Sequence, residues 1–342
     1  MELQIIWFVL WSVLWAVYFM LDGFVFGTGM LHYYLGTTDQ ERKILINTVG
    51  PVWDGNEVWL VTAGGATFAA FPTTYALMFS YLYSALLLLL FSLIIRGVSL
   101  EFRGKLHGPS WKKIWDLGIF VGSALPALLF GVAFGNIFSG LPMDAAGYHG
   151  SLLSLLNPYG LVSGVVFVIL FLVHGSLYAA VKTEGRVRER AIEVAEGVWA
   201  AELLITSAFL IATVISTNLY ENYRSLPLLM VVPALAVVSL VMIKIFLSAG
   251  KALSAFASSC VLIVLIISTG LIGLFPNLIP SSTNALYSLT IYNSSSSAYT
   301  LKIMTVVALV FVPIVIAYKI WVYRVFRSRV TADEVMKNEE AY

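Results

Sequence analysis

The chain has 342 residues, of which 59% are hydrophobic and only 11% charged, and its formal net charge is +1. Soluble globular domains are about 45–50% apolar and about 25% charged, so this composition indicates an integral membrane protein. The near-neutral charge gives no sign of nucleic-acid binding, and the single cysteine, Cys260, excludes an intrachain disulfide or a metal site built from several cysteines.

Apolar runs of about 20 residues, the length that crosses about 30 Å of hydrocarbon, recur along the chain. The first, residues 5–34, is too long for a cleavable secretory signal and has no basic start, so we expect a retained helix. The next stretch, residues 48–71, is more polar, and its hydropathy alone does not show whether it crosses the membrane. Further runs lie at residues 72–95, 114–138, 158–181, 198–217, 225–247, 252–275 and 300–325.

The basic residues decide whether residues 48–71 form a span, because cytoplasmic loops carry the excess of Lys and Arg. With nine spans, all of the 20 basic residues except Arg224 and Lys302 fall on one side of the membrane. Without that span, the first two basic clusters would lie on opposite sides. The sequence therefore predicts an all-α integral membrane protein with nine transmembrane helices, the N-terminus outside and the C-terminus in the cytoplasm. Residues 1–330 form one membrane domain, and residues 331–342 a short cytoplasmic tail.

Four acids lie inside predicted spans or at their cytoplasmic ends. Asp54 and Glu57 are three residues apart and share a helix face, and Asp22 lies in the first helix. Glu101, together with Arg96, is placed at or just past the cytoplasmic end of the third span. Charged groups in lipid are costly, and chains of acids form proton relays, so these residues are candidates for a proton path. The alternative, equally open, is local pairing: Asp54 with Asn56 or a backbone N–H, and Glu101 with Arg96 or Arg103.

Other polar residues have plainer explanations. His174 could ligate a haem iron or a metal, but a lone histidine within a span is more often a hydrogen-bonded packing residue. Glu202, at the start of the sixth span, is expected to pair with the basic loop that contains Arg186 and Arg190. The chain has no phosphate-binding loop, metalloprotease motif or nucleophile elbow, which argues against an ATP-driven or hydrolytic enzyme.

The polar motifs of the chain closely resemble those of subunit II of cytochrome bd-type quinol oxidases, and the resemblance spans nearly the whole sequence. The most specific block runs from Gly50 to Leu60 and contains Trp53-Asp54-Gly55-Asn56-Glu57. Other matching segments are Asp22-Gly23-Phe24, Gly27 to Leu31, Glu41-Arg42, Thr62 to Pro72, Trp115 to Gly118, Gly131 to Asn136, Asn157 to Leu161, Phe275-Pro276 and Pro280 to Thr283.

This resemblance implies two four-helix bundles plus one peripheral helix in a prokaryotic cytoplasmic membrane. It implies a respiratory-chain partner, subunit I, that contains haem b and haem d and the quinol site, so that this chain holds no cofactor, metal or catalytic residue of its own. The complex would oxidise quinol and reduce dioxygen to water with cytoplasmic protons. A small third subunit and bound membrane lipid are left open.

The resemblance also suggests roles for individual residues. Asp54 matches an acid on a proton route, Glu101 an acid nearer the cytoplasmic mouth, and Asp22 an acid of the first-helix motif. Trp59 matches a tryptophan at the subunit interface, near the oxygen route. Many relatives have a second acid in the first-helix motif where this chain has Val25. A relay through that second acid cannot operate here, so a path must use Asp54, Glu57 or Glu101 differently, or the partner.

We therefore expect a haem-free subunit of a bd-type oxidase that supports subunit I and supplies a cytoplasmic proton path. One alternative is a secondary transporter in which Asp22, Asp54 and Glu57 bind a coupling ion, which broken helices and internal repeats would favour. The other is an oxidase subunit that serves only as a scaffold.

Overall fold

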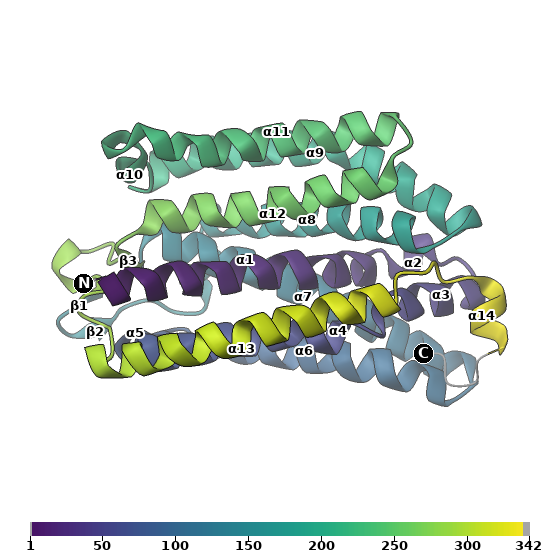
Figure 1. Cartoon of the computed structure of the whole chain (residues 1–342), viewed down its shortest axis with the longest axis horizontal. Helices are drawn as coiled ribbons and strands as arrows, with labels where there is room; N and C mark the ends of the chain where they lie inside the picture. Colours follow the sequence, from purple (N-terminus) through teal and green to yellow (C-terminus); the bar gives the residue numbers. More distant parts are fainter. Residues whose placement is uncertain (1, 338–342) are drawn as a thin grey trace.

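The computed structural model describes residues 2–337, and its long helices run side by side along the longest axis of the molecule (Figure 1). Eight helical segments are long and apolar enough to cross a membrane. The long helices are α1 (Glu2–Met30), α4 (Trp53–Ala70), α5 (Pro72–Tyr81), α6 (Tyr83–Phe102), α7 (Pro109–Ser139), α8 (Pro158–Lys182), α9 (Gly185–Ser216), α11 (Val231–Ser248), α12 (Ala252–Leu274) and α13 (Ala298–Val325).

Short elements connect the long helices at the two ends of the molecule. The short α-helices are α2 (His32–Leu35), α3 (Asp39–Val49), α10 (Tyr220–Ser225) and α14 (Ala332–Lys337). The 3-10 turns are η1 (Arg103–Lys105), η2 (Leu153–Leu156), η3 (Pro227–Met230) and η4 (Ala285–Tyr287). Strands β1 (Met143–Asp144) and β2 (Gly147–Tyr148) pair antiparallel, as do β3 (Asn277–Ile279) and β4 (Leu289–Thr290).

The ambiguous stretch at residues 48–71 contains helix α4, which packs against α1. The predicted helix is confirmed, but α4 is not among the eight segments that meet the length and hydropathy criteria. Its first turns contain Asp54, Asn56 and Glu57, and these polar side chains lower the hydropathy of an 18-residue helix. The count of nine spans therefore remains a prediction.

The third predicted span, residues 72–95, both starts and ends too early in the sequence. The chain forms α5, breaks at Leu82, and continues as α6 to Phe102, so the apolar span is Tyr83–Lys105. Arg96 therefore lies inside a helix and is fully buried, rather than at the helix end. The helix can contain this arginine because two carboxylates from other helices neutralise it, as described below.

Helix α1 lies at the centre of the molecule and packs against α4, α7, α8 and α12. Its contact with α8 requires glycine, because a Cβ at Gly27 would lie 1.8 Å from the carbonyl oxygen of Phe171. Around this axis, α6 packs on α7, while α8, α9, α11 and α12 pack on one another. Helix α13 contacts α1 along its edge and is exposed over most of its surface.

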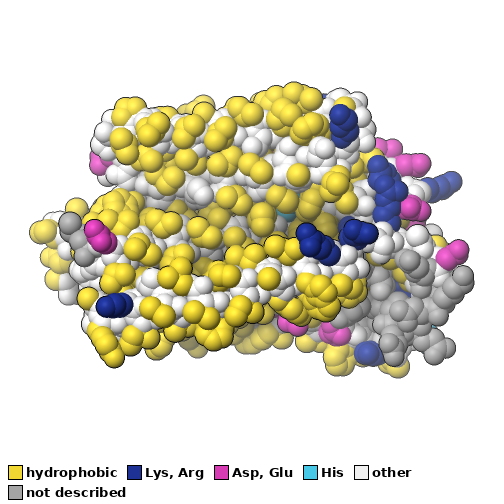
Figure 2. All heavy atoms as spheres, viewed as in Figure 1, with side chains coloured by type: hydrophobic (Ala, Val, Ile, Leu, Met, Phe, Trp, Pro, Cys, Tyr) yellow, Lys and Arg dark blue, Asp and Glu magenta, His cyan; other side chains and the backbone are white. Residues whose placement is uncertain are grey.

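The two ends of the molecule differ in charge. The end that holds the N-terminus also holds both small sheets, whereas α2, α3 and α14 lie at the other end (Figure 1). On the face drawn in Figure 2, apolar side chains cover the middle and charged side chains gather toward the end with α2 and α3. Thr38 caps α3 through a reciprocal capping box with Glu41. Of the predicted tail, residues 332–337 form α14 and residues 338–342 lie outside the described part of the chain.

Candidate functional site

A cluster of three charged side chains lies between α1, α4 and α6, and we call Asp22, Glu57 and Arg96 the inner cluster. Nη2 of Arg96 donates hydrogen bonds to Oδ2 of Asp22 at 2.8 Å and to Oε1 of Glu57 at 2.5 Å. The side chains of Asp22 and Arg96 are fully buried, and that of Glu57 is 25% exposed. Helix packing thus brings together two predicted acids with an arginine that the sequence had placed at a helix end.

The inner cluster combines two carboxyl groups with one permanently charged guanidinium. The guanidinium carbon of Arg96 lies 4.2 Å from the centre of the Phe26 ring, which adds a cation–π contact. Within residues 2–337, Nε and Nη1 of Arg96 and Oδ1 of Asp22 have no hydrogen-bond partner. Lys319, whose Nζ lies beside Gly55 and whose charge acts on Asp22, adds a second cation close to the cluster. The inner cluster therefore gathers carboxyl groups and cations at one largely buried place, an arrangement found both in structural ion pairs and in proton relays.

Asp54 lies one turn from the inner cluster but points to the surface of the chain. It is exposed, while the neighbouring Asn56 is fully buried. Nδ2 of Asn56 donates to the carbonyl of Leu21 at 2.8 Å, and Oδ1 accepts from the hydroxyl of Tyr323 at 2.8 Å. Local pairing of Asp54 with Asn56 is therefore wrong, because that amide serves to join α4 to α1 and α13.

The remaining two predicted residues lie apart from the inner cluster. Glu101 is half-buried near the end of α6, and no hydrogen bond or ion pair joins it to another described residue. The expected pairing with Arg96 or Arg103 is wrong because both arginines bind other carboxylates. Trp59 is 8% exposed and belongs to the apolar core that includes Trp11.

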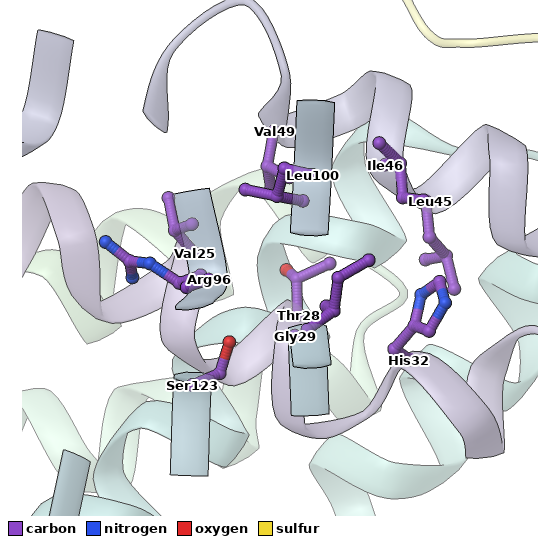
Figure 3. Close-up of a pocket in the computed structure, with 11 residues that line it drawn as sticks. Val25, Thr28, Gly29, His32, Leu45, Ile46, Val49, Arg96, Leu100 and Ser123 are labelled. Atoms are coloured by element: carbon purple, nitrogen blue, oxygen red, sulfur yellow. The ribbon is translucent and has the colours of Figure 1, made fainter. Parts of the chain in front are cut away.

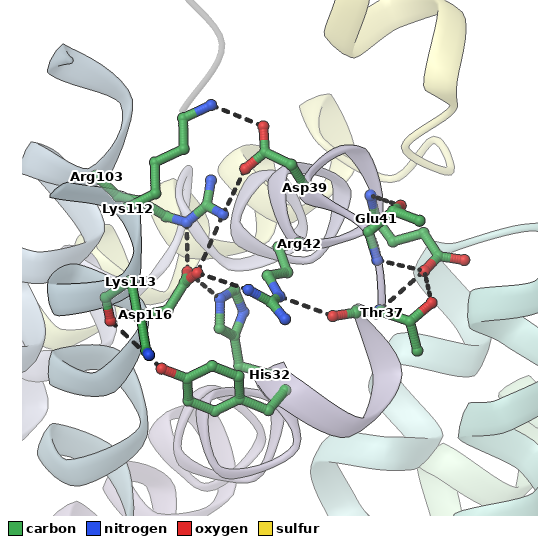
Figure 4. Close-up of polar contacts among 12 residues, drawn as sticks. His32, Thr37, Asp39, Glu41, Arg42, Arg103, Lys112, Lys113 and Asp116 are labelled. Carbon is green, nitrogen blue, oxygen red and sulfur yellow. Dashed lines mark hydrogen bonds and ion pairs between the residues drawn. The ribbon is translucent and has the colours of Figure 1, made fainter. Parts of the chain in front are cut away.

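A second charged group, which we call the outer network, lies at the end of the molecule that holds α2 and α3, with Asp116 of α7 at its centre (Figure 4). Asp116 binds Nε2 of His32 at 2.6 Å, Nε of Arg103 at 2.5 Å and Nη1 of Arg42 at 3.0 Å. Arg103 and Lys112 both donate to Asp39, at 2.8 and 2.7 Å. Two stretches distant in sequence, residues 32–42 and 103–116, are thereby tied together.

Sequence reasoning missed both Asp116 and His32. Asp116 was part of a matching motif but was given no role, and His32, which is 1% exposed, was not among the candidate residues. Burial lowers the pKa of His32 below its usual value of 6.5, although the hydrogen bond with Asp116 acts in the opposite direction. Burial acts to raise the pKa of Asp39, but hydrogen bonds from Lys112 and Arg103 outweigh it, and the net shift is downward. The outer network thus consists of a neutral histidine among paired ions.

His174 and Glu202 complete the set of buried titratable side chains considered from the sequence. Nδ1 of His174 is hydrogen-bonded to Ser259 at 2.7 Å, Nε2 to the carbonyl of Met20 at 2.9 Å, and the ring stacks on Phe256. Both ring nitrogens are therefore engaged, as in a packing residue. Glu202 is 2% exposed, and neither of its oxygens bonds to another described residue. The expected ion pair is wrong because Arg186 and Arg190 lie in the first turns of the same helix, α9, several turns before Glu202. Arg190 pairs with Glu41 instead.

Comparison with known proteins identifies the family of the chain. The family model for cytochrome bd terminal oxidase subunit II matches residues 3–326. The chain is 37% identical to the cytochrome bd-I ubiquinol oxidase subunit 2 of Escherichia coli, covering 98% of this chain and 97% of that one. It is also 37% identical to the cytochrome bd ubiquinol oxidase subunit 2 of Bacillus subtilis, with 98% and 99% covered.

A solved structure shows the same fold. The structure of bd oxidase from Geobacillus thermodenitrificans contains a chain that superposes with a TM-score of 0.79 at 18% identity, covering 95% of this chain and 99% of that chain. The full-length match to the family model and the 37% identity to curated relatives establish the relationship. The chain belongs to the family of subunit II of cytochrome bd terminal oxidases.

Proposed function

We propose that this chain supplies protons from the cytoplasmic side to the oxygen-reducing centre of a bd-type quinol oxidase. The observation that supports this function is the inner cluster, in which Asp22, Glu57 and Arg96 share a buried site while Asp54 lies exposed one turn away. Protons enter at the outer network, pass through the inner cluster and leave toward the partner at Asp54. Glu101 is an alternative entry acid near the end of α6.

The proposed orientation in the membrane follows from the basic side chains. We place the N-terminus outside and the C-terminus in the cytoplasm, so that the outer network lies at the cytoplasmic surface, where Lys and Arg are enriched. In this arrangement α4 is the ninth span. Helices α1, α4, α6 and α7 form one four-helix bundle, α8, α9, α11 and α12 form the other, and α13 is the peripheral helix.

The proposed partner is subunit I, which covers the surface of α4. An exposed acid in a membrane helix needs protein or water around it, and Asp54 lies on the same side of α4 as the exposed side chains of Val61 and Phe68. No described atom lies within 4 Å of the place where a Cβ on Gly64 or Gly65 would be. Small residues of this kind let another helix approach closely. The buried Trp59 packs in the core on the inner side of α4 and would hold this helix in position at the interface.

The haems of the complex fit subunit I better than this chain. Histidine is a common axial ligand of haem iron, and both nitrogens of the buried His174 are engaged by Ser259 and Met20. The buried His32 is bound to Asp116. We therefore assign haem b, haem d and the quinol site to subunit I, and no step of the chemistry to a cofactor in this chain.

The test uses the purified complex of both subunits. Asp54→Asn should slow quinol-driven oxygen consumption while the visible haem spectrum stays unchanged, because the variant removes a proton carrier and leaves the haems in place. Unchanged turnover in Asp54→Asn and in Asp22→Asn would favour the scaffold role instead. A complex without haem bands would overturn the oxidase assignment as a whole.

A further inference from the structure

A small cavity lies between the inner cluster and the outer network. Its volume is about 10 Å³, and helices α1, α3, α6 and α7 enclose it. Figure 3 shows the side chains that line it, with Val25 and Thr28 from α1, His32 from the start of α2, Arg96 from α6 and Ser123 from α7. Arg96 of the inner cluster and His32 of the outer network both border it, so a path between the two charged groups can pass here.

Several polar atoms at this cavity lack a good partner in the protein. Oγ of Ser123 is buried and has no hydrogen-bond partner within residues 2–337. The hydroxyl of Thr28 donates only a long hydrogen bond, 3.4 Å, to the carbonyl of Gly175. His32 uses Nε2 for Asp116, and its Nδ1 bonds to no other described residue. Buried polar groups in proteins are nearly always hydrogen-bonded, so this set needs a further partner.

The size of the cavity limits what that partner can be. A cavity of about 10–15 Å³ holds one water molecule, and a buried water needs two to four polar partners. Ser123, Thr28 and His32 offer three. An organic ligand would not fit in about 10 Å³, and the residues that line the cavity include no carboxylate to bind a metal cation, while Arg96 would repel one.

We propose that this cavity is a binding site for one water molecule, held by Ser123, Thr28 and His32, and that this water passes protons between the outer network and the inner cluster. The proton-carrying part rests on the proton path proposed above, whereas the binding part does not. In each transfer the water accepts one proton from the side of His32 and releases another toward Asp22. The water is thereby regenerated, and no bond other than O–H is made or broken.

The place of Val25 explains why a water is needed at this point. Asp22 and Val25 lie on α1 and His32 begins α2 just beyond its end, so Val25 stands between the two charged groups along the chain. Val25 is buried, borders the cavity and has no polar side-chain atom. The side chain between the two charged groups therefore cannot relay a proton itself, and a water beside it can.

The binding part is tested by high-resolution cryo-electron microscopy of the complete oxidase. We expect a density peak for one water within about 2.7–3.2 Å of Oγ of Ser123. A dry cavity at a resolution that shows other buried waters would overturn the proposal.

The proton-carrying part is tested with Ser123→Ala, which removes one hydrogen bond to the water but leaves the space. We expect proton uptake to slow by up to about tenfold with an unchanged haem spectrum. The matched control is Ser99→Ala, since Ser99 is equally buried but bonds to the carbonyl of Ile95 and does not border the cavity. It should behave as the wild type.

Two outcomes separate this inference from the proposed function. If Asp22→Asn slows proton uptake and Ser123→Ala and Thr28→Val do not, a path exists but does not use this water, and the inference is overturned. If Asp22→Asn and Asp54→Asn are also without effect, the proposed function itself falls, and the proton-carrying part falls with it. The density at Ser123 then decides the binding part alone.

Discussion

Arg96 determines how charge is held inside the membrane domain, because one buried guanidinium neutralises carboxylates from two other helices. An exposed ion pair contributes about 0–1 kcal/mol. Removing one partner of a buried pair, by contrast, costs about 3–5 kcal/mol, since the remaining charge is left uncompensated. Arg96 is therefore a residue on which both the proposed path and the stability of the chain depend.

We predict that Arg96→Gln destabilises the chain by about 3–5 kcal/mol, because Asp22 and Glu57 lose their cation. The measurement is the temperature at which the detergent-solubilised complex loses its haem absorbance. Arg329→Gln is the control, since Arg329 pairs with Glu184 at 3.3 Å with both side chains about half exposed. Equal effects of the two substitutions would contradict a special role of Arg96.

Because His32 is buried, we expect the stability of the folded chain to depend on pH. Its folded-state pKa is lowered from 6.5 by burial, so the unfolded chain binds the proton more tightly than the folded chain. Stability is then complete above about pH 6.5 and declines as the pH falls through the range between the unfolded and folded pKa values. The lowered pKa of Asp39, from 3.8, acts only at more acidic pH.

We therefore expect the melting temperature of the complex to fall between pH 7.5 and pH 5, and His32→Gln to flatten this slope. The melting temperatures of both proteins are compared across the range. The same slope in both would assign the pH dependence to other groups.

Among the elements, α4 and α6 mark the limit of what could be predicted from the sequence. The basic side chains favoured a span at residues 48–71, and a helix, α4, is found there, although the span itself stays a prediction. The end of α6 was misplaced because Arg96 resembles a loop cation until its partners on α1 and α4 are known. Asp22 and Glu57 could be chosen as candidates from composition alone, but their pairing depends on tertiary contacts between segments distant in the sequence.

The open surface of α4 leads to a prediction about assembly. Gly65→Leu should leave this chain folded but lower the amount of subunit I that copurifies with it, because a side chain there would fill space reserved for a partner helix. Gly197→Leu in α9 is the matched control, since a Cβ there also meets no described atom and the residue lies on the other bundle. Normal copurification of Gly65→Leu would exclude this surface from the interface.

At the scale of the whole molecule, the charge asymmetry between the two ends predicts the orientation. In a Cys260→Ala background, a cysteine introduced by Leu153→Cys should react with a membrane-impermeant maleimide in intact cells, because the exposed loop at residue 153 faces outward. A cysteine introduced by Arg186→Cys should react only after the cells are permeabilised. The reverse pattern would invert the topology and place the outer network on the wrong side for cytoplasmic protons.

The fold class and the family could be predicted from composition, loop charge and polar motifs, which are local properties of the sequence. The outer network could not, because Asp116 and His32 are 84 residues apart and meet only through the packing of α7 beside the end of α1. The same holds for the cavity beside Val25, which four helices enclose. Long-range packing thus determines which side chains meet along the proposed path, whereas the sequence indicates only the candidate acids.

The central claim, that this chain delivers protons for oxygen reduction, is tested most directly by proton uptake in a single turnover. Reduced complex is mixed with oxygen in the presence of a pH-indicator dye, and haem oxidation is followed in the same sample. In Asp22→Asn, where Glu57 still pairs with Arg96, we expect proton uptake to slow by about tenfold or more, with an unchanged haem spectrum. Uptake at the wild-type rate would contradict the proposed path.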